Sequence, residues 1–347
     1  MKIAFFSRNL HFAGPLVEEL RQHHTVRVWR YNENDLVNTI SIQSLLNWCD
    51  VGFLEWLQPP SVEISQIQAI DKPLIVFCQG IDVYNHTMVD WRNISGLIIQ
   101  HANYDRLISV RQNWEKRHPD APPLPKLPVI CTESVGVDLD AFTLTEIVEP
   151  EYHIVIHASQ IREVKRIYTA IQTFYDLIIQ DPDKPWKMTL IGQWESGYKE
   201  VPRREYLQAL RELIQILDFP PNRFFMIPQD LPPKKWISFA KTADIYWCTS
   251  WRESFGASMG EVVASGGRPF VNNYLGATQI YPAEVLCNTP NEMVQKTIAW
   301  GNLSVEEKLN LRKENRKLME PFDCRKATKN MRVFIEKIEA NSRSKKR

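Results

Sequence analysis

The first half of the chain alternates short apolar runs with longer polar stretches of helical character. The apolar runs predict strands at 2–7, 25–29, 51–56, 74–78, 97–100 and 129–131. Between the first two runs, Leu16, Val17 and Leu20 recur at helical spacing behind Gly14-Pro15, which suits a helix with proline in its first turn. Strands that alternate with helices predict a parallel α/β sheet.

The second half of the chain repeats this plan. Apolar runs predict strands at 154–157, 188–191, 224–227, 245–248, 269–271 and 284–286. Helical spacing of apolar residues is clear in two stretches, 167–178 and 207–217. Ser304 and Glu307 have the spacing of a capping box, which predicts the start of a further helix.

The length of 347 residues exceeds one ordinary core and predicts two domains. A proline-rich stretch at 119–128 and a polar segment at 143–151 flank the expected boundary. We therefore expect domains at 1–140 and 141–322. The remaining residues, 323–347, are expected to form a helix over 323–340 with one apolar face, followed by a basic tail.

Composition and charge exclude several classes of protein. Hydrophobic residues make up 44% and charged residues 24%, which is typical of a soluble globular protein. The net charge of +1 lacks the basic field that a nucleic-acid partner would require. No apolar run reaches membrane-spanning length and the first residues do not form a signal peptide, so we expect a cytoplasmic protein. The basic end, 342–347, leaves open a weak peripheral contact with the inner membrane face.

Chemistry-bearing residues concentrate after the predicted strand at 245–248. In open α/β sheets, ligands bind beyond the carboxyl ends of the strands. Here the strand runs into a loop with Glu253 and Gly256, and then into a helix that carries Glu261. A helix N-terminus presents unpaired N–H groups that suit a diphosphate, and glycine permits close approach of the backbone. The two carboxylates are placed to hold different hydroxyls of one long ligand.

This arrangement resembles the donor site of glycosyltransferases with the GT-B fold, in particular family 4, whose motif is a glutamate, seven residues and a second glutamate. Further matches to that family follow its order: 136–142, Lys165, 190–192 and 243–245. The resemblance covers about 135–285 and is only topological before that. It implies two Rossmann-like domains facing each other across a cleft, an amino-terminal acceptor domain, a nucleotide-sugar donor domain and a final helix that crosses back to the first domain.

The resemblance also implies roles for individual residues. Glu253 would hold hydroxyls of the transferred sugar, Lys165 would neutralise the diphosphate leaving group, and Glu261 would take the ribose hydroxyls. The amides around Ser254, Phe255 and Gly256 would face the sugar or diphosphate, and Gly14 would face the diphosphate from the other domain. The donor would be UDP- or GDP-linked, and the acceptor a glycan, a lipid-linked molecule or a small molecule. The implied reaction retains the anomeric configuration and uses no metal ion and no cofactor.

Some positions depart from the family pattern. Gln160 stands where the family commonly has arginine, and Gln279 stands where a glutamate is common; both enter the predicted site only through the alignment. Arg162 and Arg166 are candidates to replace the missing cation. These departures keep one alternative open, a catalytically degenerate sugar-nucleotide or glycan-binding protein of the same fold. A sugar-nucleotide epimerase is a second alternative, because it could share the architecture.

Several single residues have a plain structural alternative. Lys165 could be an exposed lysine at a helix start, and Gly14 a simple turn glycine. Trp194 is the best tryptophan candidate for a pocket wall. His153 and His157 share one face of a strand, but the sequence offers no third ligand for a metal. The sequence leaves the oligomeric state undetermined.

Overall fold

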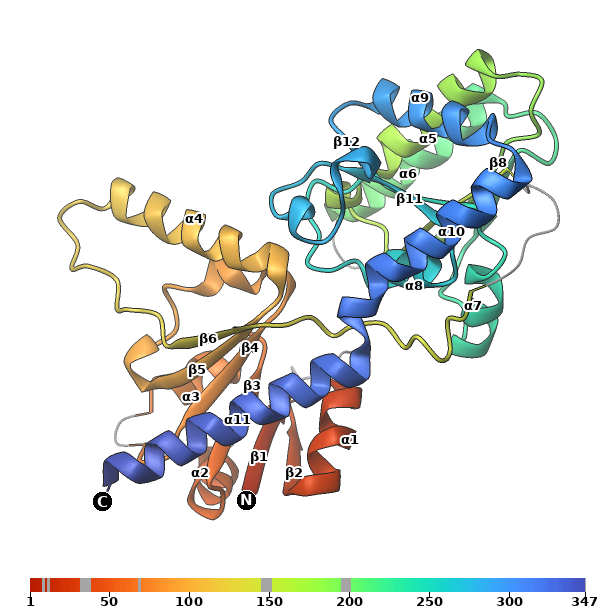
Figure 1. The fold of residues 1–347 in the computed structure, drawn as a ribbon. Coiled ribbons are helices and arrows are strands. Elements are labelled where there is room, and N and C mark those ends of the chain that lie inside the picture. Colours follow the sequence, from red (N-terminus) through yellow and green to blue (C-terminus); the bar gives the residue numbers. More distant parts are fainter. Residues whose placement is uncertain are drawn as a thin grey trace. The chain divides into compact units, whose positions relative to one another are not determined.

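The computed structural model of the chain describes residues 1–7, 10, 13–31, 39–67, 70–144, 152–194 and 201–346. The chain divides into two compact units, Met1–Gly136 with Cys324–Arg347, and Val137–Asp323. Each unit contains one parallel sheet, and among the described residues each sheet has six strands (Figure 1). The prediction of two Rossmann-like α/β domains is confirmed by this architecture.

The first sheet has the strand order β2-β1-β3-β4-β5-β6. Its strands are β1 (Lys2–Ser7), β2 (Thr25–Arg30), β3 (Val51–Glu55), β4 (Leu74–Cys78), β5 (Ile94–Ile99) and β6 (Val129–Thr132). All neighbours pair in parallel. The direction in which strands are added reverses between β1 and β3, which makes their carboxyl ends the switch point of this sheet.

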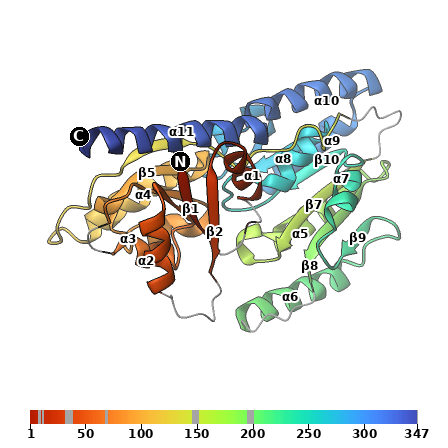
Figure 2. The same cartoon turned by 90° about the horizontal axis from the view of Figure 1, so that it is seen from below.

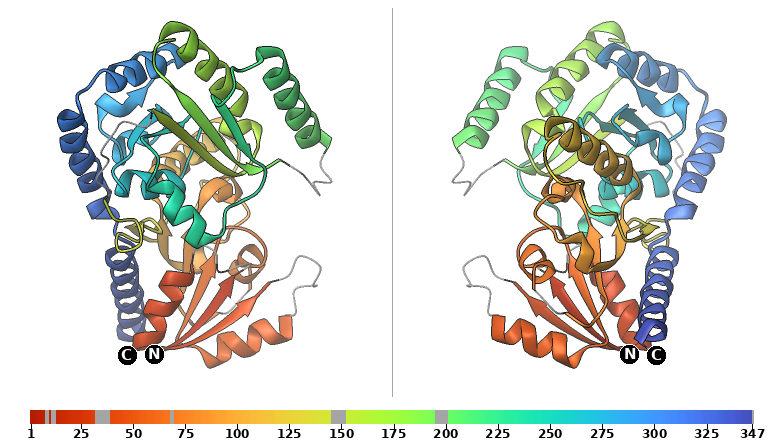
Figure 3. Two further views of the ribbon diagram at one scale, coloured as in Figure 1. Left: turned by 90° about the vertical axis from the view of Figure 1, so that its right-hand side faces the viewer. Right: turned by 90° about the vertical axis from the view of Figure 1, so that its left-hand side faces the viewer.

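Helices cover both faces of the first sheet. They are α1 (Gly14–His23), α2 (Thr39–Trp48), α3 (Ser61–Ser65), α4 (His101–Arg117) and α11 (Cys324–Lys346), with short 3-10 turns at η1 (Gly80–Asn85) and η2 (Trp91–Asn93). Helix α11 lies alongside α1 (Figure 3), and Arg332 binds Glu19 at 2.8 Å between them. Gly96 lets α11 approach β5, because a Cβ there would lie 3.0 Å from the Phe334 ring.

The second sheet has the order β12-β11-β10-β7-β8-β9. Its strands are β7 (His153–Gln160), β8 (Lys187–Gln193), β9 (Phe224–Ile227), β10 (Ile245–Cys248), β11 (Arg268–Asn272) and β12 (Leu286–Cys287). This is the strand order of the doubly wound nucleotide-binding fold, with its switch point between β7 and β10. Both strands are followed by residues of the predicted donor motif.

The helices of the second unit pack in two layers. They are α5 (Ile167–Gln180), α6 (Val201–Leu217), α7 (Pro233–Ala240), α8 (Ala257–Ala264), α9 (Pro290–Gly301) and α10 (Val305–Met319), with 3-10 turns at η3 (Glu163–Lys165), η4 (Ala277–Gln279), η5 (Ala283–Val285) and η6 (Glu320–Phe322). Helix α5 contacts α9, and α8 contacts α10, beside which it lies in Figure 2.

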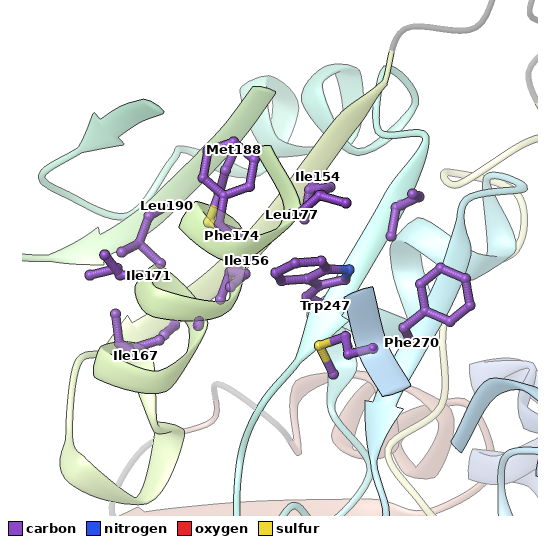
Figure 4. Packing of buried hydrophobic residues seen from close by; sticks show 14 of the residues in the cluster. Ile154, Ile156, Ile167, Ile171, Phe174, Leu177, Met188, Leu190, Trp247 and Phe270 are labelled. Atoms are coloured by element: carbon purple, nitrogen blue, oxygen red, sulfur yellow. The ribbon is translucent and has the colours of Figure 1, made fainter. Parts of the chain in front are cut away.

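The core of the second unit fixes the two strands at the switch point. Trp247 of β10 is fully buried in one apolar cluster with Phe174 of α5 and Ile154 of β7 (Figure 4). Its indole nitrogen donates to the Thr297 hydroxyl at 3.1 Å, so the polar atom of this large ring is satisfied inside the core. The loops that leave β7 and β10 therefore start from rigid strand ends.

Local predictions were mostly confirmed. The capping box of Ser304 and Glu307 begins α10, because both reciprocal hydrogen bonds are present. The strand predicted at 284–286 is wrong: Ala283–Val285 form a 3-10 turn and only Leu286–Cys287 pair with β11. The residues at 284–286 predict a strand because they are largely apolar. Apolar character indicates burial, and burial alone does not distinguish a strand from a turn. Trp194 is also corrected, since it is 3% exposed and packs in the core.

Among the described residues, no helix is long and apolar enough to span a membrane.

Candidate functional site

The switch point of the second sheet brings Lys165 and Glu253 together. Lys165 ends η3, just after β7, and Glu253 lies in the loop that follows β10. The Lys165 ammonium donates to Glu253 Oε1, and the same oxygen accepts from the Ser250 hydroxyl at 2.7 Å. Their side chains are 29% and 15% exposed, so the ion pair is shielded but reachable.

The charge state of Lys165 follows from its surroundings. Burial lowers the pKa of this lysine, but the charge and hydrogen bond of Glu253 outweigh burial and hold the pKa above its ordinary value. Lys165 is therefore an ammonium throughout the neutral range. The reading of Lys165 as an exposed helix-start lysine is wrong, because the side chain is paired and mostly covered.

Backbone contacts join the two loops that carry this pair. The Thr249 hydroxyl donates to the Lys165 carbonyl at 2.8 Å, and the Trp251 amide donates to the Val164 carbonyl at 2.9 Å. Arg166 takes the left-handed conformation, with φ of 51°. Its guanidinium lies 5.7 Å from the Trp251 ring centroid, so a second cation borders the same loop.

Helix α8 begins directly behind this loop. Its N-cap residue, Gly256, has φ of 76°, a conformation that glycine adopts without strain. Gly256 has no side chain that could cap this terminus, and the first-turn N–H groups of a helix suit an anionic ligand. Phe255 is 2% exposed and packs its ring 5.3 Å from Phe322, which anchors the loop; Ser254 lies half-buried between Phe255 and Glu253.

Glu261 lies one turn further along α8 and is held by a tryptophan. The Trp236 indole nitrogen, on α7, donates to Glu261 Oε2 at 2.5 Å. Burial raises the pKa of Glu261, while this hydrogen bond works in the opposite direction. One carboxylate oxygen is thus fixed, and the carboxylate is oriented before any ligand arrives.

The remaining predicted residues occupy separate places. Gln160 is exposed at the end of β7, where it pairs in register with Gln193. Gln279 is exposed at the end of η4, after β11. Gly14 opens α1 in the first unit, and a Cβ at this position would meet no atom within 4 Å.

Sequence reasoning assigned no supporting role to the residues that hold the site in place. Ser250 and Trp236 hold the two glutamates, and Ser258, His157 and Asp230 form a hydrogen-bonded group nearby. Position alone could have indicated His157 and Asp230, since His157 ends the strand predicted at 154–157 and Asp230 follows the strand predicted at 224–227. Among the described residues, no group of three or more histidine, cysteine, aspartate or glutamate side chains could hold a metal ion.

The switch point of the first sheet carries a different buried polar cluster. Glu55 ends β3 and is 2% exposed; it accepts hydrogen bonds from the Ser7 hydroxyl and, at 3.2 Å, from the Gln79 amide. Asp82 lies nearby and accepts from the Leu57 amide at 3.1 Å. Burial raises the pKa of Glu55 to about 7, against the effect of its hydrogen bonds.

Glu55 predicts a pH-dependent stability. Its raised pKa favours the protonated acid in the fold, so its stabilising contribution is complete below pH 4.5 and is lost as the pH rises through about 7. We expect Glu55→Gln to be about 3 kcal/mol more stable relative to wild type at pH 8 than at pH 4.5, measured by urea unfolding. The exposed Glu18→Gln should show no such difference; equal changes in both variants would contradict the assignment.

Comparison with known proteins identifies the architecture. Neither a protein-family model nor a curated protein sequence matches the chain. Solved structures do match. The E. coli trehalose-6-phosphate structure with bound UDP-2-fluoro glucose has 10% identity and a TM-score of 0.73 over 98% of this chain and 99% of that chain. Sucrose-phosphate synthase from Thermosynechococcus elongatus has 12% identity and a TM-score of 0.71 over 98% and 100% of the two chains.

A third similar structure is a UDP-forming α,α-trehalose-phosphate synthase from Burkholderia vietnamiensis, with 11% identity and a TM-score of 0.73 over 97% of this chain and 100% of that chain. At such identities the likeness establishes the fold. The chain has the two-domain GT-B architecture of these glycosyltransferase structures.

Proposed function

We propose that the chain is a glycosyltransferase that moves a sugar from a nucleoside-diphosphate sugar to an acceptor hydroxyl. The observation that carries the proposal is the Lys165–Glu253 pair at the switch point of the second sheet, in the loops that precede the glycine-initiated N-terminus of α8. A cation and helix N–H groups suit a diphosphate, and a carboxylate suits sugar hydroxyls. The second unit would then be the donor domain and the first unit the acceptor domain.

Each residue has a chemical task in this proposal. Glu253 accepts hydrogen bonds from the transferred sugar, and Lys165 neutralises charge on the departing diphosphate. Glu261, with one oxygen fixed by Trp236, offers its other oxygen to ribose hydroxyls. Arg166 supplies the second cation, because Gln160 stands where the family commonly has an arginine. The family resemblance supports retention at the anomeric carbon without a metal ion, with the donor diphosphate assisting removal of the acceptor proton.

The second candidate is a sugar-nucleotide-binding protein that has lost turnover. One observation favours it: Gln160 occupies the exposed end of β7, where the family has an arginine beside the phosphates. The two candidates share the donor site and differ in chemistry. Release of nucleoside diphosphate from a bound donor, by transfer or by slow hydrolysis, separates them.

The first experiment is a thermal-shift panel of UDP, GDP and ADP and their common sugar conjugates, run with EDTA present. A ligand that binds only the native state stabilises it by about 2.7 kcal/mol at a concentration of 100 Kd. We expect one nucleotide to raise the melting temperature despite the chelator, because Lys165 and the helix amides replace a metal ion. The absence of a shift with every nucleotide would overturn the proposed donor site.

A further inference from the structure

His157, three residues before the carboxyl end of β7, is held between a carboxylate and a hydroxyl. Its Nε2 lies 3.2 Å from Asp230 Oδ1, and its Nδ1 lies 3.0 Å from the Ser258 Oγ. Asp230 follows β9, and Ser258 lies in the first turn of α8. The His157 side chain is only 9% exposed. Both ring nitrogens are thus engaged by groups from different parts of the chain.

The ring is fixed by further contacts. The Tyr246 hydroxyl, on β10, donates to the His157 carbonyl at 3.0 Å and accepts from its amide at 3.3 Å. The Trp236 ring lies 4.5 Å from the imidazole, centroid to centroid. The Gln193 amide donates to the other oxygen of Asp230 at 3.4 Å. The imidazole therefore has little freedom to rotate away from Ser258.

The direction of the hydrogen bond to Ser258 depends on one proton. An ionised Asp230 can only accept, so Nε2 of His157 carries a hydrogen. In the neutral ring, Nδ1 must then accept, and the Ser258 hydroxyl donates its hydrogen to it. In the protonated ring, Nδ1 becomes a donor as well. The Ser258 oxygen must accept in that state, and its hydrogen is directed away from His157.

Because of where Ser258 lies, protonation of His157 would affect ligand binding. Ser258 belongs to the helix turn whose N–H groups face the proposed diphosphate position. A hydroxyl hydrogen directed away from His157 can be donated to a phosphate oxygen. We propose that His157 is a positioning residue of the donor site, which by gaining a proton turns the Ser258 hydroxyl into a hydrogen-bond donor to the ligand's diphosphate. This inference rests on the proposed function.

The charges around His157 set its state before the ligand binds. Burial lowers the pKa of His157 most; Lys165, from η3, lowers it further, while Asp230, from the segment after β9, raises it. From α8, Glu261 is bound to Trp236, whose ring packs on the imidazole, and β10 presents the Tyr246 hydroxyl. The net pKa lies below its ordinary value of 6.5, so the ring is neutral at pH 7 without ligand.

A bound diphosphate changes this balance. Its negative charge near Ser258 favours the imidazolium, so the ligand and the proton bind cooperatively. Affinity for the diphosphate should then fall as the pH rises between the pKa of the ligand-free state and the higher pKa of the bound state. A phosphate group also titrates near pH 6, but that contribution is common to all variants of the protein.

Ser258, His157 and Asp230 are the three residue types of a nucleophilic triad, but the two nitrogens of the imidazole face the opposite partners. In such triads Nε2 faces the serine and Nδ1 faces the carboxylate. Here Nδ1 faces Ser258 and Nε2 faces Asp230. Ser258 also sits beside helix amides that suit a phosphate anion. The geometry favours control of a hydroxyl donor over covalent catalysis.

The test measures the dissociation constant of UDP, with GDP and ADP in parallel, from pH 5.5 to pH 8. The proteins are wild type, His157→Gln, Ser258→Ala and the exposed control His118→Gln. Calorimetry in two buffers of different ionisation enthalpy counts the protons taken up on binding. For a pKa of His157 that rises by one on binding, we expect the affinity of wild type relative to His157→Gln to be several-fold greater at pH 5.5 than at pH 8, with about tenfold as the upper limit.

The variants separate the outcomes. Loss of the pH-dependent component in both His157→Gln and Ser258→Ala, with His118→Gln like wild type, supports the inference. Ser258→Ala removes only one oxygen, so it remains informative if His157→Gln folds poorly. A full pH dependence in Ser258→Ala would overturn the inference, since His157 would then act by charge without the hydroxyl. Binding with no pH difference among the proteins overturns the inference alone; no nucleotide binding by wild type overturns the proposed function as well.

Discussion

Lys165→Ala should lower the rate of donor cleavage by about 10²–10³-fold, which corresponds to roughly 3–4 kcal/mol of transition-state stabilisation. The reason is that negative charge grows on the diphosphate as the bond to the sugar breaks. Glu253 holds the Lys165 ammonium, and the Thr249 hydroxyl holds the Lys165 backbone carbonyl, so the ammonium need not reorganise when that charge develops. The measurement is the release of nucleoside diphosphate at saturating donor.

Two further variants make the Lys165 experiment specific. Lys317→Ala removes a lysine whose side chain is 61% exposed on α10, and it should leave turnover unchanged. The double variant Lys165→Ala with Glu253→Gln removes both charges of the pair. If the two residues act as one unit, the loss of activity in the double variant, expressed as a free energy, will be smaller than the sum of the losses in Lys165→Ala and in Glu253→Gln. Unchanged turnover in Lys165→Ala itself would contradict the role of this lysine.

Glu261→Ala should weaken nucleotide binding by about 10–100-fold, because hydrogen bonds to a charged group contribute about 1.5–3 kcal/mol. The ribose lies away from the bond that breaks, so this contribution is equal in the ground state and the transition state. We therefore expect KM and the dissociation constant to rise while kcat changes little. Calorimetric titration with the nucleotide, together with donor-cleavage kinetics, measures both.

The Glu261 experiment has a matched control and an orientation test. Glu314→Ala removes a glutamate that is 61% exposed on α10, and nucleotide affinity should be unaffected. Trp236→Phe removes the indole nitrogen that fixes one carboxylate oxygen and should give an intermediate loss of affinity. A nucleotide affinity that is the same in Glu261→Ala and wild type would place the ribose elsewhere.

Together these variants distinguish the two candidate functions. A glycosyltransferase requires that Lys165→Ala mainly lowers kcat and Glu261→Ala mainly lowers affinity. A protein that has lost turnover would retain the nucleotide affinity and its dependence on Glu261, but wild type would release no nucleoside diphosphate from the donor. The exposed Gln160 makes this comparison necessary, because the proposed function then needs Arg166 as its second positive charge.

Much of the fold is readable from the sequence because its signals are local. The parallel sheets follow from apolar runs separated by helical stretches, and α10 begins where the Ser304 capping box predicts. The spacing of Glu253 and Glu261 likewise places one carboxylate in a loop and the other on a helix. The failures are equally instructive: the run at 284–286 and Trp194 are apolar because they are buried, and burial does not specify strand pairing or a pocket wall.

The tertiary structure alone decided which distant residues meet. Lys165 and Glu253 are 88 positions apart, and His157 is 73 positions from Asp230 and 101 from Ser258. These contacts depend on the strand order that sets β7 beside β10, and no local pattern encodes that order. The raised pKa of Glu55 has the same origin, because burial by the whole unit sets it. Hydrophobic period and turn chemistry act over a few residues, whereas charge, desolvation and hydrogen bonding at a site depend on the folded chain.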